Sequence, residues 1–143
     1  LPRYTGRAPE RWGSYILLTN FVNYVEMFAE RFGVPVEGRD RPMQSASGRP
    51  GTPAEDITIV NFGMGSAMAA TTMDLLSAVD PKAVLFLGKC GGLKKTKLGD
   101  FVLPIAAIRG EGTSNEYLPP EVPALPSFRL QRAVSAAIIE HGM

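Results

Sequence analysis

The sequence predicts an α/β fold with a mainly parallel sheet and helices on both faces. Three short apolar runs, over residues 15–18, 57–62 and 83–87, indicate strands, and each run is nearly continuous rather than alternating. Continuous apolar strands are typical of parallel sheets that are buried on both faces. Helical patterns follow the first two runs, and alternating strands and helices build such sheets.

The first unit pairs a strand with an amphipathic helix. After residues 15–18 come Thr19 and Asn20, and a helical pattern then extends to Gly33. Its apolar positions fall on one helix face: Phe21, Tyr24, Val25, Phe28, Ala29 and Phe32. We interpret this stripe as core packing rather than as a platform for stacking bases. Residues 37–55, which are rich in Gly and Pro, are predicted to form a flexible loop.

The second unit is a strand over residues 57–62, a glycine turn over residues 63–66 and a helix over residues 67–79. The helix is expected to end before Asp80 and Pro81, because proline cannot continue a helix.

The remaining pattern contains two more strands and a final helix. A strand over residues 83–87 leads into the glycine-rich segment 88–92, and a fourth strand is predicted over residues 101–108. The four prolines of residues 109–127 exclude regular structure over most of that segment. An amphipathic helix is predicted over residues 128–139.

Both ends indicate that residues 1–143 are a fragment of a longer chain. Leu1 is not an initiator Met, and only four residues follow the last predicted helix. An α/β unit normally continues from such a helix into another strand, so we expect the sheet to be incomplete at the C-terminus.

Composition and charge exclude several classes of protein. The chain is 45% hydrophobic and 20% charged, as ordinary globular domains are. Its net charge of +1 gives no basis for binding nucleic acid or an anionic membrane. No apolar run is long enough to span a bilayer. The single cysteine, Cys90, cannot form an internal disulfide, and no signal peptide opens the chain, so we expect a cytoplasmic protein.

Glycine and polar residues follow four predicted strands, and parallel sheets bind ligands beyond the carboxyl ends of their strands. The candidates for binding substrate or phosphate are Thr19, Asn20, Gly63, Met64, Gly65, Ser66, Lys89, Cys90, Gly91, Gly92, Arg109, Glu111 and Thr113. Gly63 and Gly65 would let backbone approach a ligand, and Ser66 would cap a helix whose N-terminus favours an anion. A tight turn without a ligand explains the same glycines equally well.

The segment Gly88 to Gly92 is more specific, because it places Lys89 in a flexible backbone cradle that suits a phosphate or an oxyanion. The alternative is a lysine that extends into solvent. Cys90 also fits the role of a small buried packing residue, and His141 is expected at the surface.

A cation, a carboxylate and two hydroxyls lie within six positions after the fourth predicted strand, at Arg109, Glu111, Thr113 and Ser114. Such a set can hold a sugar or the edge of a purine. A solvated loop that is bridged internally by its own charges is the alternative.

Three segments resemble the nucleoside phosphorylase and nucleosidase superfamily: NFGMGSAMAATTMDLL, VLFLGKCGGL and GDFVLPIAAIRGEGTSNEYLPP. Within it they look most like the AMP nucleosidase branch, and RYTG and SYILLTNF strengthen that choice. The similarity leaves out only the loop at residues 37–55. The resemblance implies the N-terminal half of a catalytic domain that hydrolyses AMP to adenine and ribose 5-phosphate, without a cofactor or metal. It also implies a homo-oligomer, and it leaves room for a phosphate or nucleotide effector.

Two departures from related phosphorylases favour water as the nucleophile. Phe86 matches the position of the arginine that grips inorganic phosphate in those enzymes, and Lys89 matches a Ser or Thr. In the superfamily the general acid, an Asp, and the Met-Glu segment that holds the ribose hydroxyls both follow the region seen here. We therefore expect the catalytic residues beyond Met143 and an isolated chain that is inactive.

Three alternatives remain at this point. A nucleoside phosphorylase of the same fold would need inorganic phosphate for cleavage. A flavodoxin-like binding module would hold a flavin phosphate at the same strand-end glycines and would be coloured. In the third alternative, the chain alone is a structural half-domain that turns over no substrate.

Overall fold

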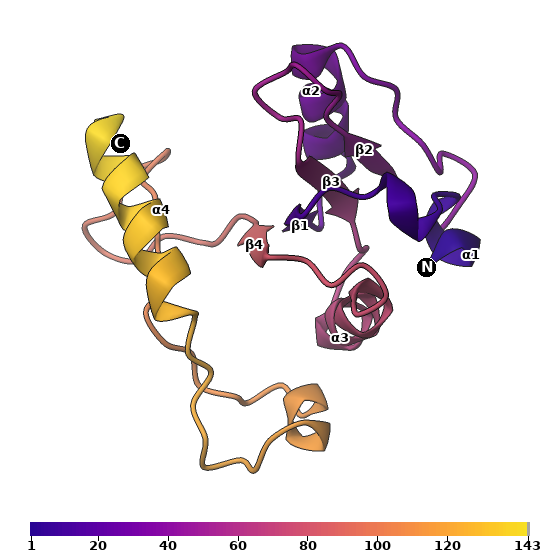
Figure 1. Ribbon diagram of the computed structural model, residues 1–143. Coiled ribbons are helices and arrows are strands. Elements are labelled where there is room, and N and C mark those ends of the chain that lie inside the picture. The colour runs from indigo at the N-terminus through magenta and orange to yellow at the C-terminus, as the bar shows by residue number, and fades with distance from the viewer. Residues whose placement is uncertain (143) are drawn as a thin grey trace. The chain divides into compact units, whose positions relative to one another are not determined.

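The structure is a computed structural model that describes residues 1–142 (Figure 1). The chain forms two compact units, Leu1–Gly88 and Lys89–Met143. No helix among the described residues has both the length and the apolar character needed to cross a bilayer.

A four-stranded sheet forms the centre of the first unit, in the order β2-β3-β1-β4. Its strands are β1 (Tyr15–Thr19), β2 (Ser45–Ser47), β3 (Ile57–Asn61) and β4 (Ala83–Leu87). β1 runs parallel to both β3 and β4, whereas the edge strand β2 is antiparallel to β3. The predicted mainly parallel sheet is therefore confirmed.

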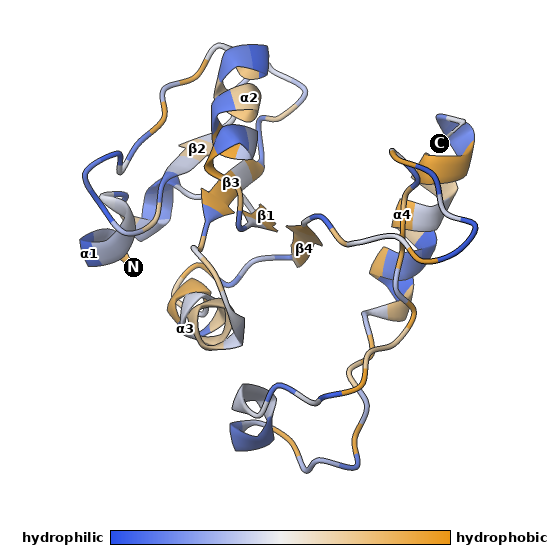
Figure 2. Cartoon of the chain, turned by 180° about the vertical axis from the view of Figure 1, so that it is seen from behind, coloured by the Kyte–Doolittle hydropathy of each residue, from blue (hydrophilic) through white to orange (hydrophobic). Residues whose placement is uncertain are grey.

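Two helices, α2 (Val22–Phe32) and α3 (Ser66–Leu76), cover opposite faces of this sheet (Figure 1). Successive strand residues point to opposite faces, so Ile59 packs with Phe28 of α2 while Val60 packs with Leu76 of α3. Figure 2 shows that β3 is hydrophobic along most of its length, as a strand covered on both faces should be. The prediction of helices on both faces is confirmed.

Local backbone conformation and hydrogen bonds determine where the two helices end. α2 ends at Gly33, which takes the left-handed conformation with φ 58° and donates its N–H to the carbonyl of Ala29. α3 ends earlier than residue 79, where the sequence pattern places its end. The Ser77 hydroxyl donates to the Asp74 carbonyl at 2.6 Å, and this local bond replaces a further helical turn.

The segment predicted as a flexible loop, residues 37–55, contains β2, so that prediction is wrong for Ser45–Ser47. Met43, Ala46 and Ala54 are fully buried, which anchors the segment to the sheet on both sides of its glycines and prolines. A strand of three residues is too short to show a periodic pattern in the sequence.

Gly48 is the position in this segment where any side chain would collide with backbone. A Cβ there would lie 1.7 Å from the carbonyl oxygen of Ala54, and the Gly48 N–H is held by the Ile57 carbonyl at 3.0 Å. We expect Gly48→Ala to lower the free energy of unfolding by about 1–3 kcal/mol, because the two backbones must separate. Denaturant titration measures this, with Gly110→Ala, which meets open space, as the control. Equal losses of stability in the two variants would contradict the claim that a clash at Gly48 causes the loss.

The second unit contains a short 3₁₀ helix, η2 (Thr113–Glu116), and α4 (Phe128–Glu140). The predicted final helix is thus confirmed, but the predicted fourth strand over residues 101–108 is wrong. Among the described residues that segment makes only one isolated antiparallel bridge, between Ala107 and Ala124. Ile105 and Ile108 are 77% and 98% exposed, so at these positions the segment lacks the buried faces of a parallel strand.

Candidate functional site

The carboxyl ends of the three parallel strands meet at one edge of the first unit's sheet, which we call the carboxyl edge. The register aligns Thr19, the last residue of β1, with Asn61 of β3 and Leu87 of β4. Gly63 and Gly88 follow β3 and β4, so they lie at the same edge, as predicted.

Two polar side chains at the carboxyl edge shape the turns that leave the strands. The hydroxyl of Thr19, a fully buried residue, accepts the N–H of Phe21 at 3.2 Å. The side-chain oxygen of Asn61 accepts the N–H of Gly63 at 3.1 Å. Thr19, a predicted ligand residue, therefore directs the chain from β1 toward α2.

The glycine turn after β3 has the conformation that its composition predicts. Gly63 and Gly65 have φ values of 85° and 90°, in the left-handed region that other residues rarely adopt. A Cβ at either glycine would meet nothing within 4 Å, so backbone conformation, and not space, requires them. Met64 between them is 79% exposed.

Gly65, not Ser66, occupies the N-cap position of α3, so the predicted cap by Ser66 is wrong. At the start of α2 the N-cap residue is Phe21, whose side chain also makes no capping hydrogen bond. Both helices therefore begin at the carboxyl edge without a cap from the N-cap side chain. A helix N-terminus of this kind carries a partial positive charge and attracts anions.

Two amide oxygens of the first unit, on Asn20 and Gln44, are buried and have no hydrogen-bond partner among the described residues. Asn20 directly follows β1, and the carbonyl of Gln44 accepts the N–H of Asn61 at 2.9 Å, so both residues lie at the carboxyl edge. An unpaired buried polar atom costs about 1–3 kcal/mol and is uncommon in native structures, and Nε1 of Trp12 is another such atom in the first unit. The sequence did not point to Gln44, because its place depends on the antiparallel pairing of β2.

The second unit contains the remaining predicted ligands. Lys89, Cys90, Gly91 and Gly92 open it, and their role in binding stays a prediction. Cys90 is exposed, so its interpretation as a buried packing residue is wrong. Among the described residues, no three His, Cys, Asp or Glu side chains gather in a way that could hold a metal ion.

Arg109, Glu111 and Ser114 do come together in the second unit. Nε of Arg109 donates to the Ser114 hydroxyl at 2.9 Å, and the Glu111 carboxylate accepts the Ser114 N–H at 3.0 Å. Hydrogen bonding from Ser114 lowers the pKa of Glu111, and the charge of Arg109 acts in the same direction, so Glu111 is ionised at neutral pH. The arrangement matches the alternative of an internally bridged loop.

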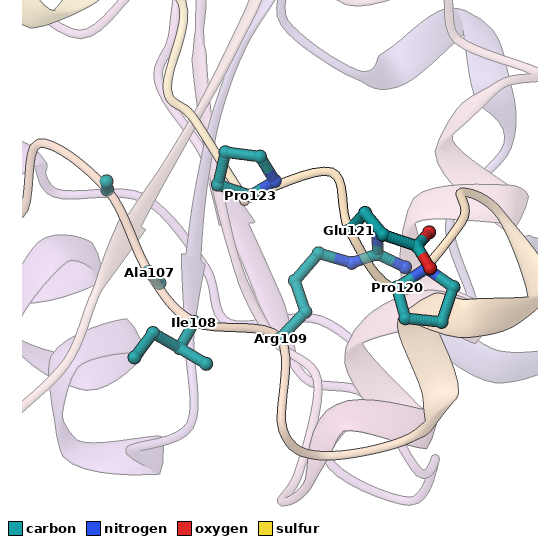
Figure 3. Close-up of a pocket in the computed structure, with 7 residues that line it drawn as sticks. Ala107, Ile108, Arg109, Pro120, Glu121 and Pro123 are labelled. Atoms are coloured by element: carbon teal, nitrogen blue, oxygen red, sulfur yellow. The ribbon is translucent and has the colours of Figure 1, made fainter.

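A cavity of about 310 Å³ adjoins this loop (Figure 3). Its wall includes Ile108 and Pro120, and its charged side chains are Arg109 and Glu121. Figure 3 shows the Arg109 side chain extending toward Pro120 and Glu121. Apolar walls beside a carboxylate are poorly suited to a phosphate group.

Comparison with known proteins places the chain in a family. A family model described as the Phosphorylase superfamily matches residues 15–143. The crystal structure of AMP nucleosidase from Bacteroides thetaiotaomicron VPI-5482 is 60% identical, with a TM-score of 0.91, and the match covers 99% of this chain and 60% of that chain.

Two curated relatives extend the comparison. AMP nucleosidase of Escherichia coli K12 is 28% identical, over 94% of this chain and 34% of that protein. Uridine phosphorylase of Treponema pallidum is 30% identical, over 87% of this chain and 48% of that protein. The chain therefore spans less than half the length of either relative. Because the family model matches the chain from β1 to its last residue, the chain belongs to the phosphorylase superfamily.

Proposed function

We propose that this protein is an AMP nucleosidase, which hydrolyses the N-glycosidic bond of AMP to adenine and ribose 5-phosphate. The observation that carries the proposal is 60% identity, across 99% of this chain, to a solved AMP nucleosidase. The curated Escherichia coli relative supports the same activity. That the enzyme is a cytoplasmic homo-oligomer, with phosphate or a nucleotide as an effector, stays a prediction.

The carboxyl edge supports water rather than inorganic phosphate as the nucleophile. Phe86 of β4 packs against Phe62, with ring centroids 5.8 Å apart, and its ring lies over Gly88, where a Cβ would come within 2.7 Å of it. By the resemblance, this aromatic pair matches the position of a phosphate-binding arginine in related phosphorylases. Aromatic rings offer no charge to attract a phosphate dianion, although their faces suit a ribose or a purine.

The uncapped starts of α2 and α3 suit the 5′-phosphate of AMP, since helix N-termini bind phosphate through backbone N–H groups. The expected transition state is loose and oxocarbenium-like, and adenine leaves after an acid protonates its ring nitrogen. Neither Glu111 nor Asp100 is assigned that role. The Glu111 carboxylate is bound to the Ser114 N–H, and Asp100 accepts the Lys97 N–H at 2.7 Å.

A nucleoside phosphorylase is the second candidate, favoured by the 30% identity to a uridine phosphorylase. The flavodoxin-like alternative is excluded by the family match.

We expect the full-length protein in phosphate-free buffer to release adenine from AMP and no free base from uridine or guanosine. Chromatography of the released bases measures this. Uracil or guanine release that starts only when phosphate is added would favour the phosphorylase.

A further inference from the structure

The guanidinium of Arg109 lies within the loop formed by residues 109–122 (Figure 3). Its Nε donates to the Ser114 hydroxyl at 2.9 Å. Its Nη1 donates to the carbonyl oxygens of Pro119, at 2.5 Å, and Val122, at 2.9 Å. Three atoms that are distant along the loop are thus held by one side chain.

The second terminal nitrogen, Nη2, is equally occupied. It donates to the carbonyl oxygens of Ser114 and Leu118, the latter at 2.6 Å, and it approaches the Asn115 side-chain oxygen at 3.4 Å. Arg109 therefore faces more acceptors than the five N–H donors of a guanidinium can serve. A substrate anion would have to displace one of these acceptors.

The composition of the loop explains why an arginine is needed there. Carbonyl oxygens in an irregular segment need donors, and proline supplies none. The loop includes Pro119 and Pro120, followed by Pro123 and Pro126, so it is poor in backbone donors. The planar fork of arginine reaches several carbonyls at once, which the single ammonium of lysine cannot do.

Ser114 connects Arg109 to the neighbouring candidate site residues. Arg109 holds its hydroxyl and its carbonyl, and Glu111 holds its N–H. We propose that Arg109 is a positioning residue, which acts through Ser114 to fix the segment that presents Thr113 to the substrate and does not itself bind the phosphate. This inference rests on the proposed function, because it concerns the same substrate.

The test compares Arg109→Ala, Arg109→Lys and the control Arg129→Ala, an exposed arginine of α4, in the full-length protein. Two readouts are used: kcat/KM for AMP, and hydrogen exchange of the Leu118 and Val122 amides, which donate to the carbonyls of Ser114 and Pro119. We expect both Arg109 variants to exchange at least about tenfold faster at these amides and to lose at least about tenfold in kcat/KM, mainly through kcat. Lysine should rescue neither readout, and Arg129→Ala should match the wild type.

Other results overturn the inference. If Arg109→Lys retains nearly full activity while Arg109→Ala raises KM for AMP, Arg109 is a charge contact to the phosphate. Unchanged exchange in both variants shows that Arg109 does not hold the loop, whatever the activity. Faster exchange with unchanged kcat/KM would show that the order of this loop does not affect catalysis. If the wild type releases no adenine from AMP, the proposed function fails, and the exchange result still decides whether Arg109 holds the loop.

Discussion

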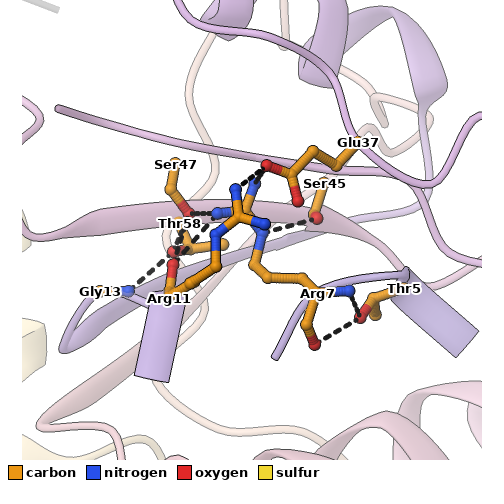
Figure 4. A network of polar contacts seen from close by, with 8 residues as sticks. All are labelled: Thr5, Arg7, Arg11, Gly13, Glu37, Ser45, Ser47 and Thr58. Atoms are coloured by element: carbon orange, nitrogen blue, oxygen red, sulfur yellow. Dashed lines mark hydrogen bonds and ion pairs between the residues drawn. The ribbon is translucent and has the colours of Figure 1, made fainter. Parts of the chain in front are cut away.

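Arg7→Met is expected to lower the free energy of unfolding by about 1.5–3 kcal/mol, because the hydroxyls that accept from Arg7 lose a charged donor. Arg7 is only 3% exposed. Its Nε donates to the Ser45 hydroxyl at 3.3 Å, and its Nη1 donates to the Ser47 hydroxyl at 2.7 Å and to the Arg11 carbonyl at 3.1 Å (Figure 4). Its Nη2 lies 3.4 Å from the carboxylate of Glu37.

This network joins the start of the chain, with α1 (Pro2–Thr5) and the 3₁₀ helix η1 (Pro9–Arg11), to the edge strand β2. Glu37 and Ser45 exchange backbone hydrogen bonds at 2.8 and 3.0 Å, so Arg7 braces both sides of that pairing. Burial lowers the pKa of Arg7 and the charge of Glu37 opposes the change, but an arginine remains protonated at neutral pH. Methionine would remove the Nε donor of the Ser45 hydroxyl and the Nη1 donor that the Ser47 hydroxyl and the Arg11 carbonyl share.

Denaturant unfolding of the two purified proteins measures the loss. The matched control is Arg39→Met, because Arg39 pairs with Glu26 at the surface, where its side chain is 61% exposed. Water screens an exposed pair, so it stabilises the fold little, and the control should lose much less than Arg7→Met. Equal losses in the two variants would show that the buried contacts of Arg7 stabilise the fold no more than an exposed ion pair does.

Lys89→Ala is expected to lower kcat/KM for AMP by about one to two orders of magnitude, because a charge-assisted hydrogen bond to phosphate is worth about 1.5–3 kcal/mol. Lys89 directly follows Gly88 after β4, is exposed, and lies close in sequence to Gly91 and Gly92. We propose it as the cation for the 5′-phosphate. Cleavage of adenosine, which lacks that phosphate, should barely change.

The assay uses full-length protein at fixed ionic strength, since salt screens an exposed phosphate contact. Lys94→Ala, another exposed lysine of the same unit, is the control and should behave as the wild type. Equal harm to AMP and adenosine would assign Lys89 a structural role, and harm to neither would leave it a solvated lysine. Lost sensitivity to phosphate with intact AMP cleavage would move Lys89 to an effector site.

The sequence predicted the parts of the fold that are encoded locally. Each parallel strand is a short apolar run, and α2, which covers one face of the sheet, has apolar residues that repeat at helical spacing. β2 and residues 101–108 were predicted wrongly for one reason. Whether a segment becomes a strand depends on a partner. The polar residues of Ser45–Ser47 pair with β3, whereas among the described residues the more apolar run over residues 101–108 makes only one isolated bridge.

The candidate site also contains features that the sequence predicted and features that it did not. Gly63 and Gly65 were predictable, because a tight turn after a strand needs positive φ and glycine supplies it. The orphaned amide oxygen of Gln44 and the partners of Arg109 were not, because both depend on which distant backbone atoms the fold brings near them. The sequence left open whether Arg109 binds a ligand or bridges its own loop, and from its contacts we infer the second role.

Product analysis in the presence of excess inorganic phosphate tests the central claim most directly. Full-length protein is incubated with AMP and phosphate, and the sugar product is identified by mass spectrometry. Hydrolysis predicts free adenine and ribose 5-phosphate in equal amounts, with no ribose 1,5-bisphosphate. Formation of ribose 1,5-bisphosphate would show that phosphate is the nucleophile and would contradict the account.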